Sequence, residues 1–528
     1  MDSGLLQRNL KALAFQNPSL ALRLCEPVGS DHIELFPSPS GELTARFTRL
    51  NIPVQCLENP VKSAEKAVEE FVAQERWNVF CFGVGLGYEL ALLLKKIPRE
   101  RRIVAYEQDP WLLRMCLSLH DFSRPLLTRN LSLLLGADVI PWWRQEAENF
   151  RIFYHPWLQS AYRPHWERLR INTDSPRRVL VAAGGLFIDD VADALQQLGC
   201  HVWLWDPQQV SLEETRRQIK TFDPRFVLSI NFIPGLASLC EDIGMNYVAW
   251  EIDPTVERLK PHKTKATTTK IFTYRKARIP HYKESGYQAV EYLPLATNPR
   301  RRYPMMLSKE ELERYEAPIS FVGSSMLAQA QTLRRLFEET CLLHGLNPEE
   351  ATNLSRPVPG HDGRLLDLGL CAAEEKASAH RRRIVGEVLE MPYGCKIWGD
   401  DGWAEMCPPS VYQGPAKHGL ELTKIYNASW INLDIARAYQ NDIVTMRVFD
   451  VLACQAFVLA EHSPAIGELF DIGRDVVVYR NRQEIRKLIH HYIRNPEERV
   501  SIARAGHERV LKDHTMDQRM AWILQYLG

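Results

Sequence analysis

The chain has 528 residues, with 65 Lys and Arg against 65 Asp and Glu, so its formal net charge at pH 7 is zero. This balance argues against polyanion binding, nucleic acid included, as the main activity, and the length exceeds what one hydrophobic core supports. We therefore expect two or three domains. A hydrophobic content of 45% with 25% charged residues is typical of an ordinary globular protein.

The 11 cysteines are scattered, and no two have Cys-x-x-Cys spacing. We expect reduced thiols in a cytoplasmic protein, without a zinc site or disulfides. The first 20 residues lack the apolar block of a signal peptide, and no apolar run is long enough for a membrane span. Nothing in the sequence indicates the oligomeric state.

A strand followed by a turn of small residues occurs three times, at residues 78–89, 178–187 and 318–326. Each opens a stretch of alternating strands and helices, the pattern of a parallel sheet with crossover connections. We predict an α/β fold of three Rossmann-like units. The expected domains are an accessory domain at 1–172, a second domain at 177–300 and a third at 310–528, whose last helix can cross back.

In the first unit, Gly83, Gly85 and Gly87 follow a strand, and Glu107 closes the next strand. A glycine turn with an acid about twenty residues later is typical of a dinucleotide or S-adenosylmethionine site. Glycines are also needed simply to turn from strand to helix at close quarters. Too few residues follow Glu107 for the full sheet of a methyltransferase, which favours a structural or vestigial ligand-binding unit. Methyltransferase activity remains the alternative.

The runs NPVKSAEKAVEEF (59–71) and VFCFGVGLGYELALLL (79–94) resemble the N-terminal part of motility-accessory-factor proteins, which modify flagellin in bacteria. The resemblance covers about 100 residues. The catalytic domain of those proteins has no visible counterpart in this chain. The resemblance suggests a protein acceptor such as flagellin; lipid-linked and polysaccharide acceptors stay open.

The second unit begins with a strand and the turn Gly184-Gly185, and its strand at 245–254 ends in Asp253. Ligands of such sheets bind beyond the carboxyl ends of the strands. Asp253 is therefore a candidate catalytic base for an acceptor hydroxyl, although Asp253-Pro254 can equally end the strand in a turn. The basic run at 260–278 is either a solvated face or the lining of a diphosphate cleft.

In the third unit, Gly323, Ser324 and Ser325 follow a strand at 319–322. Small residues at such a turn let amides and hydroxyls approach phosphate oxygens, or the serines simply cap the next helix. The polar stretch 349–364 is predicted to be an insertion or a mobile loop.

Residues 426–479 alternate strand, loop and helix, with a helix predicted at 446–454. Arg447 and Asp450 lie three residues apart on that helix and thus share a face. An arginine and free amides at a helix start near Thr445 suit a diphosphate, and a carboxylate suits ribose hydroxyls. A surface ion pair is the alternative.

The runs YNASWINLDI (426–435), MRVFDVLACQAFVLAEHSP (446–464) and ELFDIGRDVVVY (468–479) closely resemble the spore-maturation (CgeB-type) glycosyltransferases. The match extends from Arg177 to the C-terminus and implies a GT-B pair of Rossmann-like domains. Related transferases often carry two Glu residues eight positions apart, where this chain has Asp442 and Asp450. The resemblance implies that Asp450 binds ribose and that Asp442 lies near the donor sugar; the stereochemical outcome stays open.

Taken together, the sequence predicts a glycosyltransferase that uses a nucleotide sugar, without a metal or other cofactor. The predicted catalytic residues are Asp253 and Arg447. The predicted donor site comprises Gly323, Ser324, Ser325, Asp442, Thr445, Arg447 and Asp450. A non-catalytic scaffold that keeps the sugar-nucleotide pocket is a further alternative.

Overall fold

The computed structural model describes residues 3–26, 28–48, 51–72, 77–183, 186–207, 210–253, 257–258, 266–354 and 356–528. The predicted Gly184-Gly185 turn and the Lys260, Lys263 and Lys265 part of the basic run lie outside the described residues. The chain divides into two compact units, unit 1 (1–248) and unit 2 (249–528), with the division inside strand β11 (Tyr247–Glu251). The predicted three-domain boundaries do not coincide with this division and stay a prediction.

Unit 1 contains a four-stranded parallel sheet in the order β6-β5-β4-β7. Its strands are β4 (Asn78–Phe82), β5 (Ile103–Glu107), β6 (Leu131–Leu135) and β7 (Phe150–Tyr154), and the first two are followed by α4 (Tyr88–Lys96) and α5 (Pro110–Leu119). The strands are mostly buried, which fits a parallel sheet whose faces are covered. Four strands are fewer than a full methyltransferase sheet needs, as the sequence predicts.

The rest of unit 1 precedes and follows that sheet. Helices α1 (Ser3–Gln16) and α2 (Pro18–Arg23) come before an antiparallel hairpin of β1 (Ile33–Pro37) and β2 (Leu43–Phe47), and helix α3 (Pro60–Val72) comes after it. Strands β8 (Arg178–Ala182), β9 (His201–Trp205) and β10 (Phe226–Ile230) are parallel in the order β10-β8-β9, with α9 (Ile188–Gln197) and α10 (Leu212–Phe222) between them. The mixed α/β class is thus confirmed in this unit.

Early in unit 2, the parallel strands β13 (Ala266–Thr273) and β14 (Tyr287–Tyr292) pair with each other. The last helix, α22 (Met516–Tyr526), packs on β13: the Phe272 ring centroid lies 5.2 Å from that of Trp522 and 5.4 Å from that of Tyr526. Thr515 caps this helix in a capping box with Gln518. The C-terminus of the chain therefore returns to the first strands of the unit.

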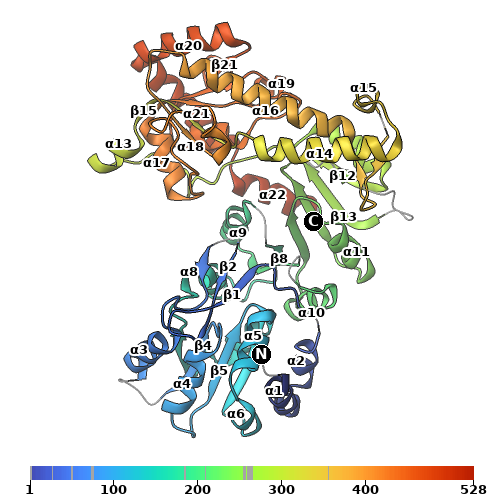
Figure 1. Cartoon of the computed structure of the whole chain (residues 1–528), viewed down its shortest axis with the longest axis vertical. Coiled ribbons are helices and arrows are strands. Elements are labelled where there is room, and N and C mark those ends of the chain that lie inside the picture. Colours follow the sequence, from blue (N-terminus) through green and yellow to red (C-terminus); the bar gives the residue numbers. More distant parts are fainter. Residues whose placement is uncertain are drawn as a thin grey trace. The chain divides into compact units, whose positions relative to one another are not determined.

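The larger sheet of unit 2 has five parallel strands in the order β18-β15-β19-β20-β21. The strands are β15 (Ala317–Val322), β18 (Cys395–Trp398), β19 (Ser429–Leu433), β20 (Val458–Glu461) and β21 (Val477–Tyr479). The helices include α14 (Leu327–His344), α16 (Leu368–Leu389), α18 (Met446–Ala453), α20 (Arg482–Arg494) and α21 (Pro496–Asp513) (Figure 1). Side chains of the strands and of α16 and α20 form one buried core.

The stretch 349–364 is not a plain loop. The stretch begins within helix α15 (Pro348–Ala351). It also contains strand β16 (Val358–Pro359), which pairs with β17 (Leu365–Leu366). Ala351, Val358 and Leu366 are buried with Cys341 in a small apolar cluster. The prediction of an insertion or mobile loop misses this structure because three widely spaced apolar residues give no periodic signal.

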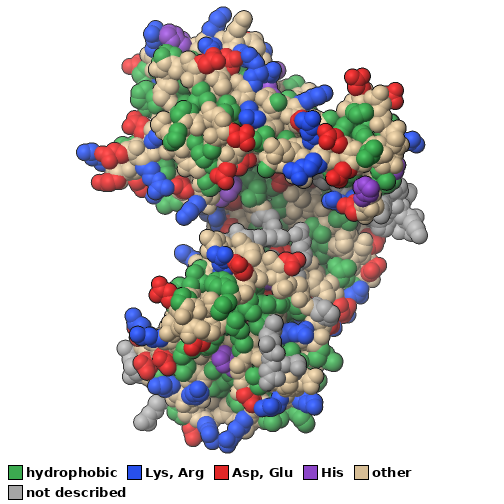
Figure 2. All heavy atoms as spheres, in the orientation of Figure 1, with side chains coloured by type: hydrophobic (Ala, Val, Ile, Leu, Met, Phe, Trp, Pro, Cys, Tyr) green, Lys and Arg blue, Asp and Glu red, His purple; other side chains and the backbone are tan. Residues whose placement is uncertain are grey.

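Two properties of the surface bear on the predicted class. Over the face drawn in Figure 2, Lys and Arg side chains are interspersed with Asp and Glu side chains, in keeping with the zero net charge. Among the helices of the described ranges, none combines the length and the apolar character that a bilayer crossing requires.

Candidate functional site

Four polar residues of unit 2 lie together at the carboxyl ends of β15 and β19. Ser324 follows β15, Asp434 follows β19, Arg447 stands in the first turn of α18, and Arg381 comes from α16. We call these four residues the strand-end cluster. Ligands of parallel α/β sheets bind at such an edge, so this is the place where a donor site is expected.

Arg447 is fixed on several sides. Its Nε donates to the Val322 carbonyl oxygen at 2.7 Å, and its Nη1 donates to a carboxylate oxygen of Asp434. The guanidinium carbon lies 4.7 Å from the Phe321 ring centroid, in cation–π contact. The side chain is 13% exposed, so the guanidinium keeps some contact with solvent while its position is set by the strand ends.

Gly323 is needed where it stands because of Arg447. A Cβ atom at this position would lie 2.6 Å from Arg447 Nη2 and 2.8 Å from the edge of the Phe321 ring. Such contacts are too close for real side chains, so a larger residue would displace the guanidinium. The predicted residues Gly323 and Arg447 are thus directly in contact.

The turn after β15 is bound by an acid from the neighbouring strand end. The Ser324 hydroxyl donates to Asp400, and the Ser325 amide donates to Asp400 Oδ1 at 2.9 Å. Burial acts to raise the pKa of the Asp400 carboxyl, but hydrogen bonds from the two serines outweigh it and hold the pKa below its ordinary value. The Gly323 amide donates to the Trp398 carbonyl oxygen at 2.9 Å.

These contacts bear on the predicted phosphate role of the turn. Two of the three amides of Gly323–Ser325 already have partners within the protein, and both serine hydroxyls also accept from amides at the start of α14, at 2.8 Å and 3.2 Å. The serines thus bind amides at the start of α14, although the N-cap residue of that helix is Met326, whose side chain makes no capping hydrogen bond. A diphosphate contact by this turn stays a prediction, and it would have to use the exposed Ser324 or replace Asp400.

Arg381 belongs to the strand-end cluster, although the sequence alone does not single it out. Its Nη1 donates to the Ser324 carbonyl oxygen at 2.9 Å and its Nη2 to the Ile435 carbonyl oxygen at 3.0 Å. Burial, together with the positive charges of Arg447 and Arg437, lowers the pKa of Arg381 to about 10. A guanidinium with a lowered pKa stands where its positive charge is poorly compensated, and an anion there would relieve it.

Asp434 connects the predicted Thr445 to the cluster. It is 1% exposed, and its Oδ1 accepts from the Thr445 hydroxyl at 2.6 Å as well as from Arg447. Thr445 is the N-cap residue of α18 by position, but its side chain makes no capping hydrogen bond because it is turned to Asp434. Asp434 was available to sequence reasoning as the acid that ends a predicted strand.

Asp450 lies elsewhere. It is 6% exposed, its Oδ1 accepts from the Thr297 hydroxyl at 2.7 Å, and its Oδ2 accepts from Arg302 Nε at 3.2 Å. Its three-residue spacing from Arg447 predicts a shared face, yet the two side chains bind different partners. A ribose contact would require this carboxylate to leave a buried ion pair, so the structure gives Asp450 a structural task and the ribose role stays a prediction.

The two remaining predicted acids also lie outside the strand-end cluster. Asp442 pairs with Arg275, whose Nη2 lies 2.7 Å from Asp442 Oδ1. Asp253 is exposed two residues beyond the end of β11, and its role as a catalytic base stays a prediction. Glu251, the last residue of β11, is buried and accepts a hydrogen bond from the Tyr282 hydroxyl at 2.9 Å.

Glu461, at the end of β20, borders the cluster. Its Oε1 lies 2.7 Å from His380 Nε2, and its Oε2 accepts from the Ala436 amide at 3.1 Å. The imidazole and carboxylate are 17% and 18% exposed. Through this pair, His380 of α16, the residue before Arg381, is linked to the loop that follows β19.

In the glycine turn of unit 1, amides of the turn donate hydrogen bonds to Glu107 of the same unit. Both oxygens of the fully buried Glu107 accept hydrogen bonds: Oε2 from the Val84 and Gly85 amides at 2.9 and 3.0 Å, and Oε1 from the Gln108 amide and the Tyr162 hydroxyl. Burial raises the pKa of this carboxyl even against these hydrogen bonds. The acid that would bind ribose hydroxyls in a methyltransferase is therefore already engaged, which supports the structural interpretation.

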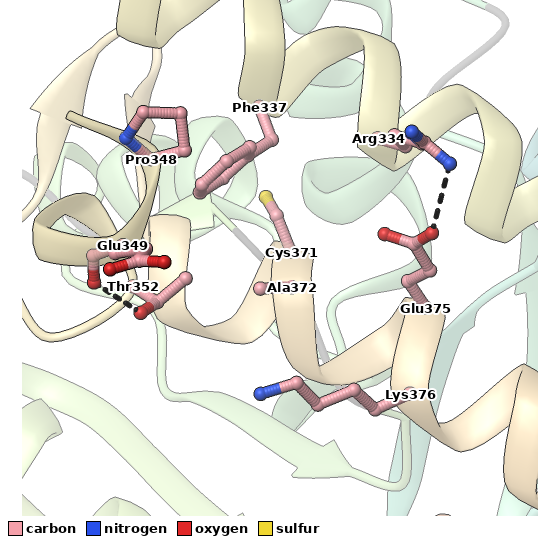
Figure 3. A pocket seen from close by; sticks show the side chains of 9 residues that line it. All are labelled: Arg334, Phe337, Pro348, Glu349, Thr352, Cys371, Ala372, Glu375 and Lys376. Carbon is pink, nitrogen blue, oxygen red and sulfur yellow. Dashed lines mark hydrogen bonds and ion pairs between the residues drawn. The ribbon is translucent and has the colours of Figure 1, made fainter. Parts of the chain in front are cut away.

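A separate pocket of about 350 Å³ lies between α14, α15 and α16 (Figure 3). Phe337, Pro348 and Cys371 supply apolar lining, and Arg334 pairs with Glu375 at 3.3 Å. None of the predicted site residues lines it. Within the described ranges, no group of three or more His, Cys, Asp or Glu side chains is arranged to hold a metal ion.

Comparisons with known proteins complete the description. No curated protein matches the chain. Two solved structures similar to it are a glycosyltransferase from Rickettsia africae (10% identity, TM-score 0.40, covering 86% of this chain and 98% of the other) and Anabaena HepE with UDP and glucose (9%, 0.42, 66% and 99%). A third is sucrose-phosphate synthase from Thermosynechococcus elongatus (12%, 0.41, 66% and 97%). At such low TM-scores and identities, these likenesses carry no functional argument.

One family profile also matches part of the sequence. Its description is "Glycosyl transferase-like", and it covers residues 376–525. The matched region contains Arg381, Asp434 and Arg447 of the strand-end cluster, while Ser324 lies before it. The region that carries the cluster's charged residues is thus similar in sequence to a glycosyl transferase-like family.

Proposed function

We propose that the protein transfers a sugar from a nucleotide-sugar donor and that the strand-end cluster binds the diphosphate of that donor. The proposal is carried by one observation: Arg381 and Arg447 converge at the carboxyl edge of a parallel sheet, inside the region that matches a glycosyl transferase-like family. Both guanidinium groups lie by the ring of Phe321, at 5.8 and 4.7 Å from its centroid.

The chemistry follows from the charges. Glycosyl transfer leaves a nucleoside diphosphate with additional negative charge, and fixed cations at that position stabilise the transition state more than the ground state. Arg447 can offer its outer nitrogen to a phosphate oxygen while Asp434 and Val322 hold the rest of the group. Arg381, which donates to the Ser324 and Ile435 carbonyl oxygens, adds a second positive charge to the cluster. The second Rossmann-like region would present the acceptor, with Asp253 as the proposed base.

The proposal also covers the fold type, the acceptor and the absence of a metal requirement. A GT-B arrangement of the CgeB type is supported by the sequence runs in 426–479, and a protein acceptor such as flagellin by the resemblance of 59–94 to motility-accessory factors. Transfer without a metal ion stays a prediction. It is checked by assaying transfer with EDTA and then with added Mg²⁺ or Mn²⁺; an activity that EDTA abolishes and the metal restores would contradict it.

The experiment that tests the proposal is a thermal-shift screen of the full chain with UDP-, GDP-, CMP- and dTDP-sugars, followed by donor hydrolysis without acceptor. We expect one nucleotide class to raise the melting temperature and its sugar to be released slowly. A clear thermal shift with no hydrolysis of any donor would favour a non-catalytic scaffold. Absence of both would overturn the proposal.

A further inference from the structure

The loop between β19 and α18 brings the strand-end cluster together. It starts after Asp434 and ends at Thr445, one residue before the helix that carries Arg447. Its residues 436–445 contain neither helix nor strand. A stretch of this kind has no internal ladder of hydrogen bonds, so its shape depends on what holds it from outside.

Two consecutive residues after β13 supply much of that support. Arg275 Nε and Nη2 lie 2.9 and 2.7 Å from Asp442 Oδ1, and Nη2 also donates to the Tyr439 carbonyl oxygen at 3.4 Å. The neighbouring Tyr274 accepts a hydrogen bond at its hydroxyl from Gln440 Nε2 at 2.8 Å. The side chains of Arg275 and Asp442 are 14% and 23% exposed, so solvent screens this ion pair only in part.

The same loop is held from α16. The Tyr439 hydroxyl donates to Glu374 Oε1 at 2.5 Å, and Glu374 is 1% exposed. The Arg275 guanidinium carbon lies 5.8 Å from the Tyr439 ring centroid. Tyr439 is thus fixed between Arg275 and Glu374, and the loop cannot shift without breaking contacts at both sides.

We propose that Arg275 is a positioning residue for the donor site: through Asp442 and Tyr439 it holds the loop 436–445 so that Thr445 and Arg447 meet Asp434. This inference rests on the proposed function for its effect on donor binding, but not for its effect on the loop. It also assigns Asp442 a task, since a carboxylate bound by Arg275 anchors the loop instead of contacting the donor sugar.

The test uses Arg275→Gln in the full chain, with Arg486→Gln as the matched control. Arg486 pairs with Glu387 at 2.8 Å in the same unit, from helix α20 to helix α16, and its side chain is 40% exposed, so its loss removes an arginine–carboxylate pair away from the loop. Hydrogen exchange without ligand is measured first. We expect amides of 436–445 to exchange about tenfold faster in Arg275→Gln and unchanged in Arg486→Gln.

Donor affinity is measured next, with the nucleotide sugar that gives the largest thermal shift in the wild type. We expect binding about tenfold weaker for Arg275→Gln and unchanged for Arg486→Gln. The charge-exchanged double variant Arg275→Asp with Asp442→Arg should recover part of both losses, because it restores the pair with opposite orientation.

The outcomes separate the two claims. If the wild type binds no nucleotide sugar, the proposed function fails, and the exchange data alone decide whether Arg275 holds the loop. If Arg275→Gln matches Arg486→Gln in exchange, the inference is overturned. It is also overturned if the loop loosens but donor affinity stays at the wild-type value.

Discussion

The turn after β4 in unit 1 and the turn after β15 in unit 2 have the same plan and different surroundings. In each, small residues lead from a strand to a helix, and an acid from a neighbouring strand end binds an amide of the turn: Glu107 in the first, Asp400 in the second. Glu107 is fully buried and its partners are amides and a hydroxyl, whereas Arg381 and Arg447 stand beside the second turn. The two turns thus differ in what stands beside them: arginine side chains lie next to the second turn, and the proposed donor site depends on that difference.

The largest expected effect comes from removing the acid of the first turn. Glu107→Ala leaves five donors without their acceptor, namely the amides of Val84, Gly85, Gln108 and Asp109 and the Tyr162 hydroxyl. At about 1 kcal/mol or more for each donor, we expect unit 1 to lose at least about 5 kcal/mol of unfolding free energy. Urea unfolding measures the loss. The exposed Glu100→Ala is the control and should stay within about 0.5 kcal/mol of wild type.

The same variant tests the alternative activity. Nucleotide-sugar affinity should be unchanged in Glu107→Ala wherever the protein stays folded. Calorimetry that finds S-adenosylmethionine bound by the wild type, and lost in Glu107→Ala without a change in stability, would contradict the structural role and revive the methyltransferase hypothesis.

The next effect concerns the acid that the sequence assigns to ribose. Asp450→Asn leaves Arg302 without its buried carboxylate, which we expect to cost about 3 kcal/mol of stability; Arg302 keeps the Gly419 carbonyl oxygen at 3.0 Å, which limits the loss. Thr297→Val removes one hydrogen bond to the same carboxylate and should cost about 1 kcal/mol. Thermal unfolding compares the two. A full-stability Asp450→Asn protein with weakened donor binding would favour the ribose role instead.

A smaller change is expected in donor binding at the second turn. Arg447→Gln should weaken binding of the best nucleotide sugar by roughly 10–100-fold, about 2 kcal/mol, because charge-assisted hydrogen bonds to the diphosphate are lost. Arg447→Lys should recover part of the affinity, since it keeps the charge but not the planar fork. Titration calorimetry gives the values, with the exposed Arg474→Gln as the control. Equal affinity in Arg447→Gln and wild type would remove Arg447 from the site.

The smallest effect is the contribution of one histidine of unit 1, His201, to the pH dependence of stability. Burial, followed by the charges of Arg144 and Arg178, lowers the pKa of His201 from 6.5 to about 4. The neutral imidazole therefore stabilises the folded state fully above pH 6.5 and loses that contribution as the pH falls towards 4. From pH 7 to 6 the loss is about 0.7 kcal/mol. Urea unfolding at pH 7 and pH 6 measures this loss. Between the two pH values, the unfolding free energy of the wild type should fall by about 0.7 kcal/mol more than that of His201→Phe. An equal change in the two proteins would refute the prediction.

The elements were more predictable than the partners of the site residues. Helices α20 and α21 begin and end at the residues that their apolar spacing and the Asn495-Pro496 break predict. The position of Arg447 at a helix start beside a strand end follows from the sequence pattern, and its role in donor binding stays a prediction. The partners of Asp450 do not follow from the sequence, because Thr297 and Arg302 lie 153 and 148 positions earlier and no local pattern encodes such a contact.

Arg381 shows the opposite case. It stands in the run Arg381-Arg382-Arg383 on a helix, where sequence alone ranks none of the three above the others. Only the packing of α16 against the strand ends turns Arg381 inward to the carbonyl oxygens of Ser324 and Ile435. The placement of Arg381 in the strand-end cluster thus follows from tertiary packing, which periodicity and spacing do not encode.

The most direct measurement is amide hydrogen exchange of the wild-type chain with and without the nucleotide sugar that gives the largest thermal shift. If the donor diphosphate binds the guanidinium groups of Arg381 and Arg447, protection from exchange will rise in 323–327 and 434–448 and will stay unchanged in 83–89. Protection at 83–89, or none in the two segments of unit 2 under saturating donor, would contradict the assignment.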